Sequence, residues 1–251
     1  MNTVYQRVSK TYVDPGLRLA GIFKAQEIAK ETTRQLASFL RPGLTYEEIR
    51  EYAERTMLSL GSESFWSRNG RGALVLFGRL SAYSGHDDPD AAFASAGITV
   101  AQDDVVSVDL CPCVDGGWGD YTRSFFLVDG KVTAEDELAP GYFKDGMALE
   151  RALHAEMIKF VDPGTTFEDL YYHISAMLAD AGWRNLDYHD NFGHSIENFP
   201  EQRLTVARGV TEKIVEHGKP LSFEPHIARG DGDGIKHEDM YVWLDGRMQC
   251  I

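Results

Sequence analysis

The hydrophobic positions of this chain follow one helical pattern that appears twice. Between residues 22 and 40, apolar side chains recur at steps of three and four, and the same spacing returns between residues 149 and 161. Such spacing is typical of an amphipathic helix that buries one face. We therefore expect a helix in each region. The apolar positions are Ile22, Ala25, Ala29, Leu36, Phe39 and Leu40 in the first, and Leu149, Leu153, Met157, Phe160 and Val161 in the second.

These two regions belong to an internal repeat. Residues 39–61 align with residues 160–182 at a constant offset of 121, without a gap. In both copies Pro-Gly precedes a threonine, and an acid follows three residues later, which is the pattern of a capped helix start. A chance likeness between two helix pairs is the alternative, but the gapless register argues against it. The predicted caps are Thr45 with Glu48 and Thr166 with Asp169.

After each helix pair the pattern changes to the apolar runs of β-strands. VVSVDL and RSFFLV follow the first pair, and PLSFEPHI and MYVWLDG follow the second. Helices followed by strands, repeated, favour an α+β fold with a mainly antiparallel sheet over an alternating βαβ arrangement. A short polar link over residues 132–141 separates the halves. We expect one domain over residues 1–251, with pseudo-repeats at about 20–130 and 141–251.

The composition narrows the possible functions. With 43% hydrophobic residues the chain can bury a substantial core. Its 25 Lys+Arg against 39 Asp+Glu give a formal charge of -14, which repels phosphates and anionic lipid, so we expect neither nucleic acid nor a membrane as partner. Neither a secretory start nor a run of about 18 apolar residues is present. These features predict a soluble, cytoplasmic protein.

The first candidate chemistry lies in DLCPCVDGGWGD, residues 109–120. A strand ending in VVSVD, a turn over residues 114–117 and a strand starting with YTRSFFLV predict a β-hairpin. Asp109 and Asp120 are nearly equidistant from this turn, so their side chains should approach to about 5 Å if they share a face. Two carboxylates at that distance repel unless a proton or cation intervenes. Exposed hairpin charges are the alternative, but the apolar strands beside both residues indicate burial.

The cysteines of this stretch do not predict a metal site. Cys111 and Cys113 have one residue between them, whereas structural zinc sites favour two to four. The only other cysteine is Cys250, and an odd number of cysteines does not make a disulfide framework. We expect three free thiols.

The second half adds three further candidate ligands, His194, Glu224 and Glu238. Taken singly, each has an ordinary structural interpretation: a hydrogen-bonded core histidine, an acid at a strand end and part of a charged turn. Together with Asp109 and Asp120 they form one imidazole and four carboxylates. That set is suited to two divalent cations.

The order of these residues resembles a known family. Along the chain there is an Asp, a second Asp after ten residues, and then Gly-His, Glu-Pro and Glu-Asp. This order, on two related helix-rich halves, resembles the pita-bread metallopeptidases over nearly all of residues 20–245. These are methionine aminopeptidases, Xaa-Pro aminopeptidases and prolidases, with creatinase as a relative. The resemblance implies two pseudo-symmetric halves with a curved antiparallel sheet and outer helices. It also implies that Asp109 binds one metal ion, that Asp120 and Glu238 bridge two, and that His194 and Glu224 complete the other site.

The resemblance also implies a chemistry. Two ions about 3.5 to 4 Å apart polarise a carbonyl and acidify a bridging water, whose proton Glu224 would take and return to the leaving amine. Carboxylate-rich ligation favours manganese, iron or cobalt and leaves zinc possible. The implied function is a dinuclear hydrolase of an amide or peptide bond, like Xaa-Pro or methionine aminopeptidases, acting on a small peptide or amide. A homodimer is plausible because twofold assemblies are the commonest soluble oligomers.

Some positions depart from the family pattern. The second histidine, usual seven residues after the Gly-His ligand, is Glu201 here, and we interpret Glu197 and Glu201 as substrate-binding acids that favour a cationic group. His86 either fills the role of an upstream catalytic histidine or decorates an acidic surface turn. Lys236 stands where many Xaa-Pro enzymes carry arginine, and the two differ in fork geometry.

These departures leave two other functions open. One is a divergent enzyme that acts on a small non-peptide C–N substrate, as creatinase does. The other is a non-catalytic pita-bread binding module. The intact set of five ligand positions argues against the binding module, because a dead site has no need to keep five costly polar groups.

Overall fold

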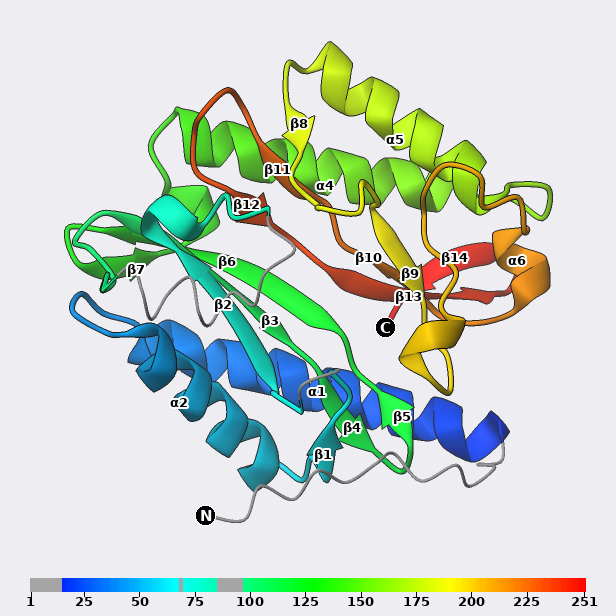
Figure 1. The fold of residues 1–251 in the computed structure, drawn as a ribbon, viewed down its shortest axis with the longest axis horizontal. Coiled ribbons are helices and arrows are strands. Elements are labelled where there is room, and N and C mark those ends of the chain that lie inside the picture. Colours follow the sequence, from blue (N-terminus) through cyan, green and yellow to red (C-terminus); the bar gives the residue numbers. More distant parts are fainter. Residues whose placement is uncertain (1–14, 68–69, 85–96) are drawn as a thin grey trace.

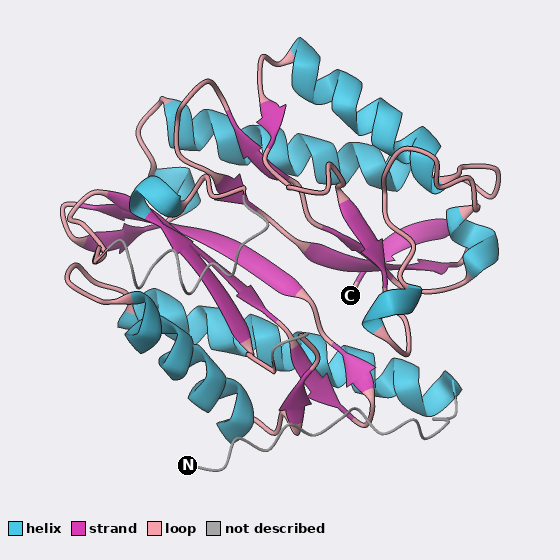
Figure 2. Cartoon of the chain, viewed as in Figure 1, coloured by secondary structure: helices cyan, strands magenta, loops and turns pink. Residues whose placement is uncertain are grey.

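The strands of this protein lie between two pairs of helices. The structure, a computed structural model, describes residues 15–67, 70–84 and 97–251. Helices α1 and α2 cover one side of the strands and helices α4 and α5 the other (Figure 1), so the helices form the outer layers (Figure 2). Their bounds are α1 Pro15–Phe39, α2 Tyr46–Ser59, α4 Tyr142–Phe160 and α5 Phe167–Asp180, with a short α6 at Ile214–His217.

Both predicted helix caps are confirmed. The Thr45 side chain accepts a hydrogen bond from the Glu48 amide, and Glu48 bonds back to the Thr45 amide. Thr166 and Asp169 form the same capping box at the start of α5. Each box satisfies amides that a helix start leaves unpaired. The local sequence therefore sets where these two helices begin.

Within the described residues, each half contains one four-stranded and one three-stranded antiparallel sheet. In the first half the orders are β2-β3-β6-β7 and β1-β4-β5. Their bounds are β1 Ser64–Phe65, β2 Ala73–Phe77, β3 Asp104–Leu110, β4 Pro112–Val114, β5 Gly117–Trp118, β6 Tyr121–Val128 and β7 Lys131–Thr133.

The second half follows the same plan, in the orders β14-β13-β10-β9 and β12-β11-β8. The short 3-10 helices are Gly78–Leu80, Glu135–Glu137 and Pro200–Gln202. The strand bounds are β8 Arg184–Asn185, β9 Gly193–Ser195, β10 Leu221–Phe223, β11 His226–Ala228, β12 Ile235–Lys236, β13 Asp239–Leu244 and β14 Arg247–Cys250.

The central strands β3 and β6 are buried on both faces. Val106 and Phe125 point into the core below α1 and α2, whereas Val105 and Phe126 point into the core beneath α4 and α5. This explains why VVSVDL is almost continuously apolar instead of alternating. Asp109 has the parity of Val105 along its strand, so its side chain lies on the face that meets the second half.

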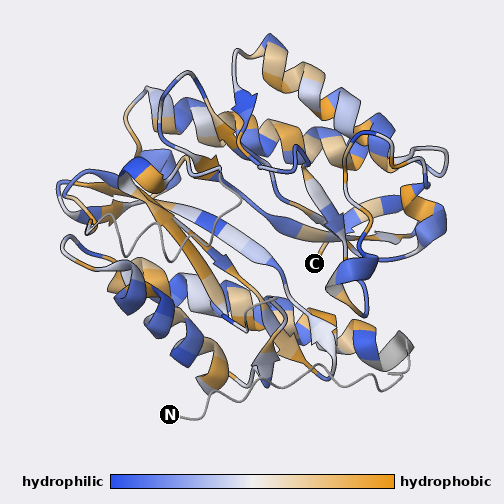
Figure 3. Cartoon of the chain, in the orientation of Figure 1, coloured by the Kyte–Doolittle hydropathy of each residue, from blue (hydrophilic) through white to orange (hydrophobic). Residues whose placement is uncertain are grey.

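The helices present apolar faces to these cores and polar faces outward (Figure 3). The predicted apolar positions of α1 are buried at Ile22, Ala25, Ala29 and Leu36. In α4 the pattern predicts Leu149 as a core position, but Leu149 is only partly buried, whereas Glu150 beside it is fully buried. The apolar stripe of α4 is therefore interrupted by a carboxyl group.

Candidate metal centre

The predicted hairpin forms, and its register places two aspartates on one face. Asp115 has φ 50° and Gly116 has φ 71°, which supplies the tight turn between β4 and β5. Asp109 lies directly opposite Thr122, so Asp120, two residues earlier, is its diagonal neighbour and shares its face. Asp120 is buried, and its amide donates to Gln26 Oε1 at 2.8 Å.

The bridging acid of the second half meets these aspartates. A carboxylate oxygen of Glu238 lies within 4.8 Å of oxygens of Asp109 and Asp120. Thr122 Oγ1 donates to Glu238 Oε2 and Ser222 Oγ donates to Glu238 Oε1, both at 2.6 Å. Glu238 is fully buried, and the two hydroxyls fix the orientation of its carboxylate.

The imidazole of His194 is oriented as a ligand would be. Its Nδ1 lies 3.0 Å from the Ser195 carbonyl oxygen, and because that oxygen only accepts, Nδ1 carries the proton. The lone pair of Nε2 then faces Asp120 Oδ2 at 3.3 Å and Glu224 Oε1 at 3.6 Å. Burial lowers the pKa of His194, so the ring stays neutral, which is the form that binds metal.

All five predicted ligand residues therefore meet in one place, at the junction of the two halves. Burial, with the neighbouring carboxylates, raises the pKa of Asp120 and of Glu238 well above the ordinary range. Burial also acts to raise the pKa of Glu224, but the charges of Lys236 and His194 outweigh it and lower that pKa overall. So many buried acids are unfavourable without a cation among them.

One atom of this cluster is consistent with a bound metal ion. Asp120 Oδ2 is buried and has no hydrogen-bond partner among the residues that the structure describes. It lies beside the lone pair of His194 Nε2 and beside Glu224. A divalent ion about 2.0 to 2.2 Å from such nitrogen and oxygen donors spans ligand separations of this size. The donor set is the one that the sequence predicts.

Two cations also contact the ligand residues. Lys236 Nζ lies 2.6 Å from Asp109 Oδ2 and 2.7 Å from Glu224 Oε2. Arg203 Nη1 lies 3.2 Å from His194 Nε2, and its guanidinium stacks over Trp66 at 5.3 Å. The sequence marks Lys236 only as a replacement of the family arginine, and no motif marks Arg203.

A cavity of about 390 Å³ opens onto the centre. Cys111 lies in its wall, where its thiol donates to the Arg71 carbonyl oxygen at 3.2 Å. Burial raises the pKa of that thiol well above its ordinary value, and all three cysteines are free, as predicted. Aromatic and polar side chains complete the lining, among them Tyr46, Trp66, Tyr188, His189 and Asn191.

The two acids predicted to bind substrate lie elsewhere. Glu197 is buried, where it accepts from Ser195 Oγ at 2.8 Å and pairs with His217 Nε2 at 2.5 Å. Glu201 is exposed on the Pro200–Gln202 helix. Neither belongs to the lining of the cavity, so their placement gives the predicted cationic substrate no support. His86, the predicted catalytic histidine, lies outside the described residues.

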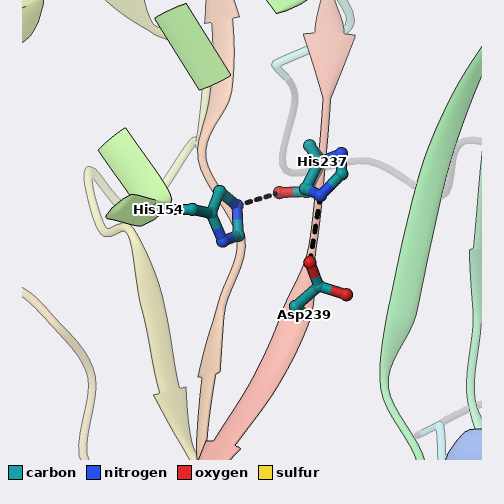
Figure 4. Close-up of side chains that lie close together, drawn as sticks. All are labelled: His154, His237 and Asp239. Carbon is teal, nitrogen blue, oxygen red and sulfur yellow. Dashed lines mark hydrogen bonds and ion pairs between the residues drawn. The ribbon is translucent and has the colours of Figure 1, made fainter. Parts of the chain in front are cut away.

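A second cluster includes the two residues on either side of Glu238 in the sequence. It contains His154 of α4 together with His237 and Asp239 (Figure 4). His154 Nε2 donates to the His237 carbonyl oxygen at 3.1 Å, and its Nδ1 accepts from the Tyr241 hydroxyl at 2.6 Å. Because both ring nitrogens are used in these bonds, we interpret the cluster as a structural link between α4 and the chain on either side of Glu238.

Arg123 joins the two halves at the same place. Its Nη2 pairs with Asp239 Oδ1 at 2.7 Å, and its Nη1 donates to the Glu238 carbonyl oxygen at 2.6 Å. The Glu238 amide in turn donates to the Thr122 carbonyl oxygen. The backbone on both sides of the junction is therefore held in register.

Comparisons with known proteins agree with this architecture. Residues 20–244 match the model of metallopeptidase family M24. Methionine aminopeptidase of Thermococcus onnurineus (strain NA1) is 24% identical over 230 residues, which cover 89% of this chain and 68% of that protein. The X-Pro aminopeptidase from Thermotoga maritima MSB8 superposes with a TM-score of 0.72 at 19% identity, over 95% of this chain and 61% of that one.

A methionine aminopeptidase from Thermotoga maritima gives a TM-score of 0.71 at 15% identity, over 95% of this chain and 98% of that one. The chain thus spans nearly all of this relative but less than two thirds of the X-Pro aminopeptidase. The chain belongs to metallopeptidase family M24 and is a metallohydrolase with the α+β pita-bread fold. In the described ranges, no helix combines the length and apolar character needed to cross a bilayer.

Proposed function

We propose that this protein is a metal-dependent aminopeptidase or dipeptidase that hydrolyses short peptides of the methionine or Xaa-Pro type. The observation that carries the proposal is the convergence of five ligand residues from both halves around the unpaired Asp120 Oδ2. The family relation supports the peptidase class. A cavity of about 390 Å³ suits a dipeptide or a small amide.

The metal and the acids have separate tasks in this proposal. Divalent ions, when bound, would polarise the scissile carbonyl and acidify a water; oxygen-rich ligation favours manganese, iron or cobalt, with zinc possible. The resemblance implies two ions for these five candidate ligands. Glu224, at the edge of the cavity, accepts the proton of the attacking water and returns it to the leaving amine.

The experiment that tests this function is a substrate screen with defined metals. Chelator-treated protein is reloaded with manganese, iron(II), cobalt or zinc and offered Met-peptides, Xaa-Pro dipeptides and small amidines or guanidines, with products followed by mass spectrometry. Release of an N-terminal residue supports the proposal. Metal binding without turnover of any class contradicts it and favours a non-catalytic binding module.

Glu224→Gln tests the assigned proton transfer. We expect turnover to fall by about 10²- to 10⁴-fold in protein that still folds, because Gln is nearly isosteric and Lys236 keeps Asp109 as a partner. Glu216→Gln is the matched control, since Glu216 is exposed and pairs with Lys213 on the surface. An unchanged rate in Glu224→Gln removes this residue from its proposed role.

The position of Glu201 favours a second candidate, hydrolysis of a small non-peptide C–N bond. The second histidine that peptidases of this family carry at this position is replaced, and Glu201 is exposed and outside the cavity lining. This position therefore supplies no imidazole to assist a peptide leaving group. Turnover of only the amidines or guanidines in the same screen would favour this candidate.

A further inference from the structure

The Lys236 ammonium lies among three of the acids that are candidate metal ligands. Its Nζ lies 2.6 Å from Asp109 Oδ2, 2.7 Å from Glu224 Oε2 and 3.8 Å from Glu238 Oε2. These three acids belong to the predicted ligand set, and they come from both halves of the molecule. An ammonium group donates three hydrogen bonds and accepts none, so it acts towards carboxylates as a compact cation.

The backbone of Lys236 is held firmly. The Lys236 amide donates to Ser124 Oγ at 2.9 Å, and Ser124 Oγ donates to the Lys236 carbonyl oxygen at the same distance. Lys236 also pairs with His226 in the sheet. Its side chain is 10% exposed. The ammonium is therefore presented to the acids by a rigid strand, as a built part of the centre.

The two sides of the centre are not equivalent. On one side, His194 Nε2, Asp120 Oδ2 and Glu224 Oε1 lie close together, and the Asp120 oxygen has no hydrogen-bond partner in the described part of the chain. On the other side, the second oxygen of Glu224 and an oxygen of Asp109 are already bonded to Lys236. Glu224 thus directs one oxygen to the ammonium and the other to the His194 side, where Arg203 Nη1 lies 3.2 Å from the imidazole Nε2.

We propose that the Lys236 ammonium takes the place of the second cation, so that the centre binds one divalent ion on the His194 side. This inference rests on the proposed metal centre and limits the number of ions that the five ligands hold. A second divalent ion between Asp109 and Glu224 would lie against the ammonium, and like charges at that distance repel strongly in a buried site. Removal of the ammonium opens the second position.

Metal stoichiometry tests the inference without any assay of activity. Chelator-treated protein is titrated with Mn²⁺ by calorimetry, and tightly bound manganese is counted by mass spectrometry after gel filtration. We expect one ion per chain in the wild type and two in Lys236→Met, which keeps most of the side-chain volume and loses the charge. Electron paramagnetic resonance should show isolated Mn²⁺ in the wild type and a coupled pair in the variant.

One variant serves as the control. Lys213→Met removes a surface lysine that is outside the cavity lining and should still bind one ion. Two tightly bound ions in the wild type overturn the inference, whether or not Lys236→Met folds. One ion in a folded Lys236→Met also overturns it. Peptide turnover is a separate readout, so a wild type with one ion and no turnover contradicts the proposed peptidase and leaves the role of Lys236 standing.

Discussion

The charge state of a buried side chain in this protein depends on the groups beside it. Asp239 is held ionised by His237 and Arg123, which lower its pKa far below the ordinary value although burial acts to raise it. Burial has the opposite consequence for His154, whose pKa it lowers to about 3, with a smaller effect of the same sign from His237. Among buried groups, an acid therefore stays charged where cationic partners outweigh the effect of burial, and an imidazole stays neutral where they do not.

The neutral His154 predicts how stability depends on pH. In the unfolded chain this histidine titrates near 6.5, whereas in the fold its pKa is about 3, so between these values only the unfolded state binds the proton. Its contribution is complete above pH 6.5 and is lost as the pH falls. At pH 5 the loss amounts to about 2 kcal/mol.

His154→Gln, which cannot take up this proton, isolates the effect. Urea unfolding at pH 7 and pH 5 should show a free energy of unfolding that falls less in the variant than in the wild type, by about 2 kcal/mol. The comparison cancels the contributions of the acids in the metal centre. Equal losses in both proteins would contradict the assignment.

At the scale of elements, helix α1 approaches the metal hairpin so closely that only glycine fits between them. A Cβ on Gly21 would lie 2.2 Å from the Val114 carbonyl oxygen, and one on Gly117 would lie 2.3 Å from the Ile22 amide nitrogen. Both obstacles are backbone atoms, which cannot move without shifting the helix or the hairpin. This contact lies next to Gln26, whose side chain accepts from the Asp120 amide.

Gly21→Ala should therefore destabilise the protein, although alanine in a helix interior is ordinarily favoured over glycine by about 0.5 to 1 kcal/mol. We expect a loss of about 1 to 3 kcal/mol from overpacking, measured by urea unfolding. Gly146→Ala in α4 is the control, because there the added Cβ meets the side-chain atoms of Ile235 and Trp183 instead of backbone. A Gly21→Ala variant that is more stable than the wild type would contradict this prediction, because it would show that α1 can move away from the hairpin without cost.

At the scale of the whole molecule, the halves are joined by polar contacts that also position the centre. Arg123 of the first half pairs with Asp239 of the second, and both side chains are largely buried, at 22% and 11% exposure. Removing Arg123 leaves the buried Asp239 carboxylate with His237 as its partner, and breaking a buried pair costs about 3 to 5 kcal/mol. The contact thus contributes to the union of the halves and to the position of Glu238.

Arg123→Met should lower the free energy of unfolding by about 3 kcal/mol. Lys24→Met is the matched control, since the Lys24–Asp115 pair is exposed at 62% and 49% and such pairs contribute about 0 to 1 kcal/mol. Chemical denaturation of both variants measures the difference. Equal losses in the free energy of unfolding of both variants would contradict a larger contribution from the buried pair.

The metal centre itself should act as a link between the halves. Because two ligand residues come from the first half and three from the second, an ion binds the folded chain and not the unfolded one. At a free metal concentration of 100 times Kd the added stability is about 2.7 kcal/mol. Asp120→Asn weakens a central candidate ligand and should lose most of this added stability. The melting temperature, measured with and without manganese, checks this, and the control Glu216→Gln should keep the full increase.

The sequence by itself determined the elements of this protein and named its candidate ligands. Helix starts at Thr45 and Thr166, the hairpin turn and the buried strands follow from interactions within a few residues, so periodicity and turn chemistry are enough to predict them. The five ligands could be named because each lies in a recognisable short motif. Their meeting at one junction was predicted from the resemblance, and the structure brings the same five residues together.

Only the tertiary structure decided which other side chains reach the centre. Lys236 contacts an acid 127 residues away, and Ser222 and Thr122 orient Glu238 from opposite halves. Glu201, close to His194 in sequence, lies outside the cavity. Such contacts depend on strand register and on how the halves pack, and a shift of one residue turns a side chain to the other face of a sheet. Short sequence motifs do not determine the register between strands that are distant in the sequence.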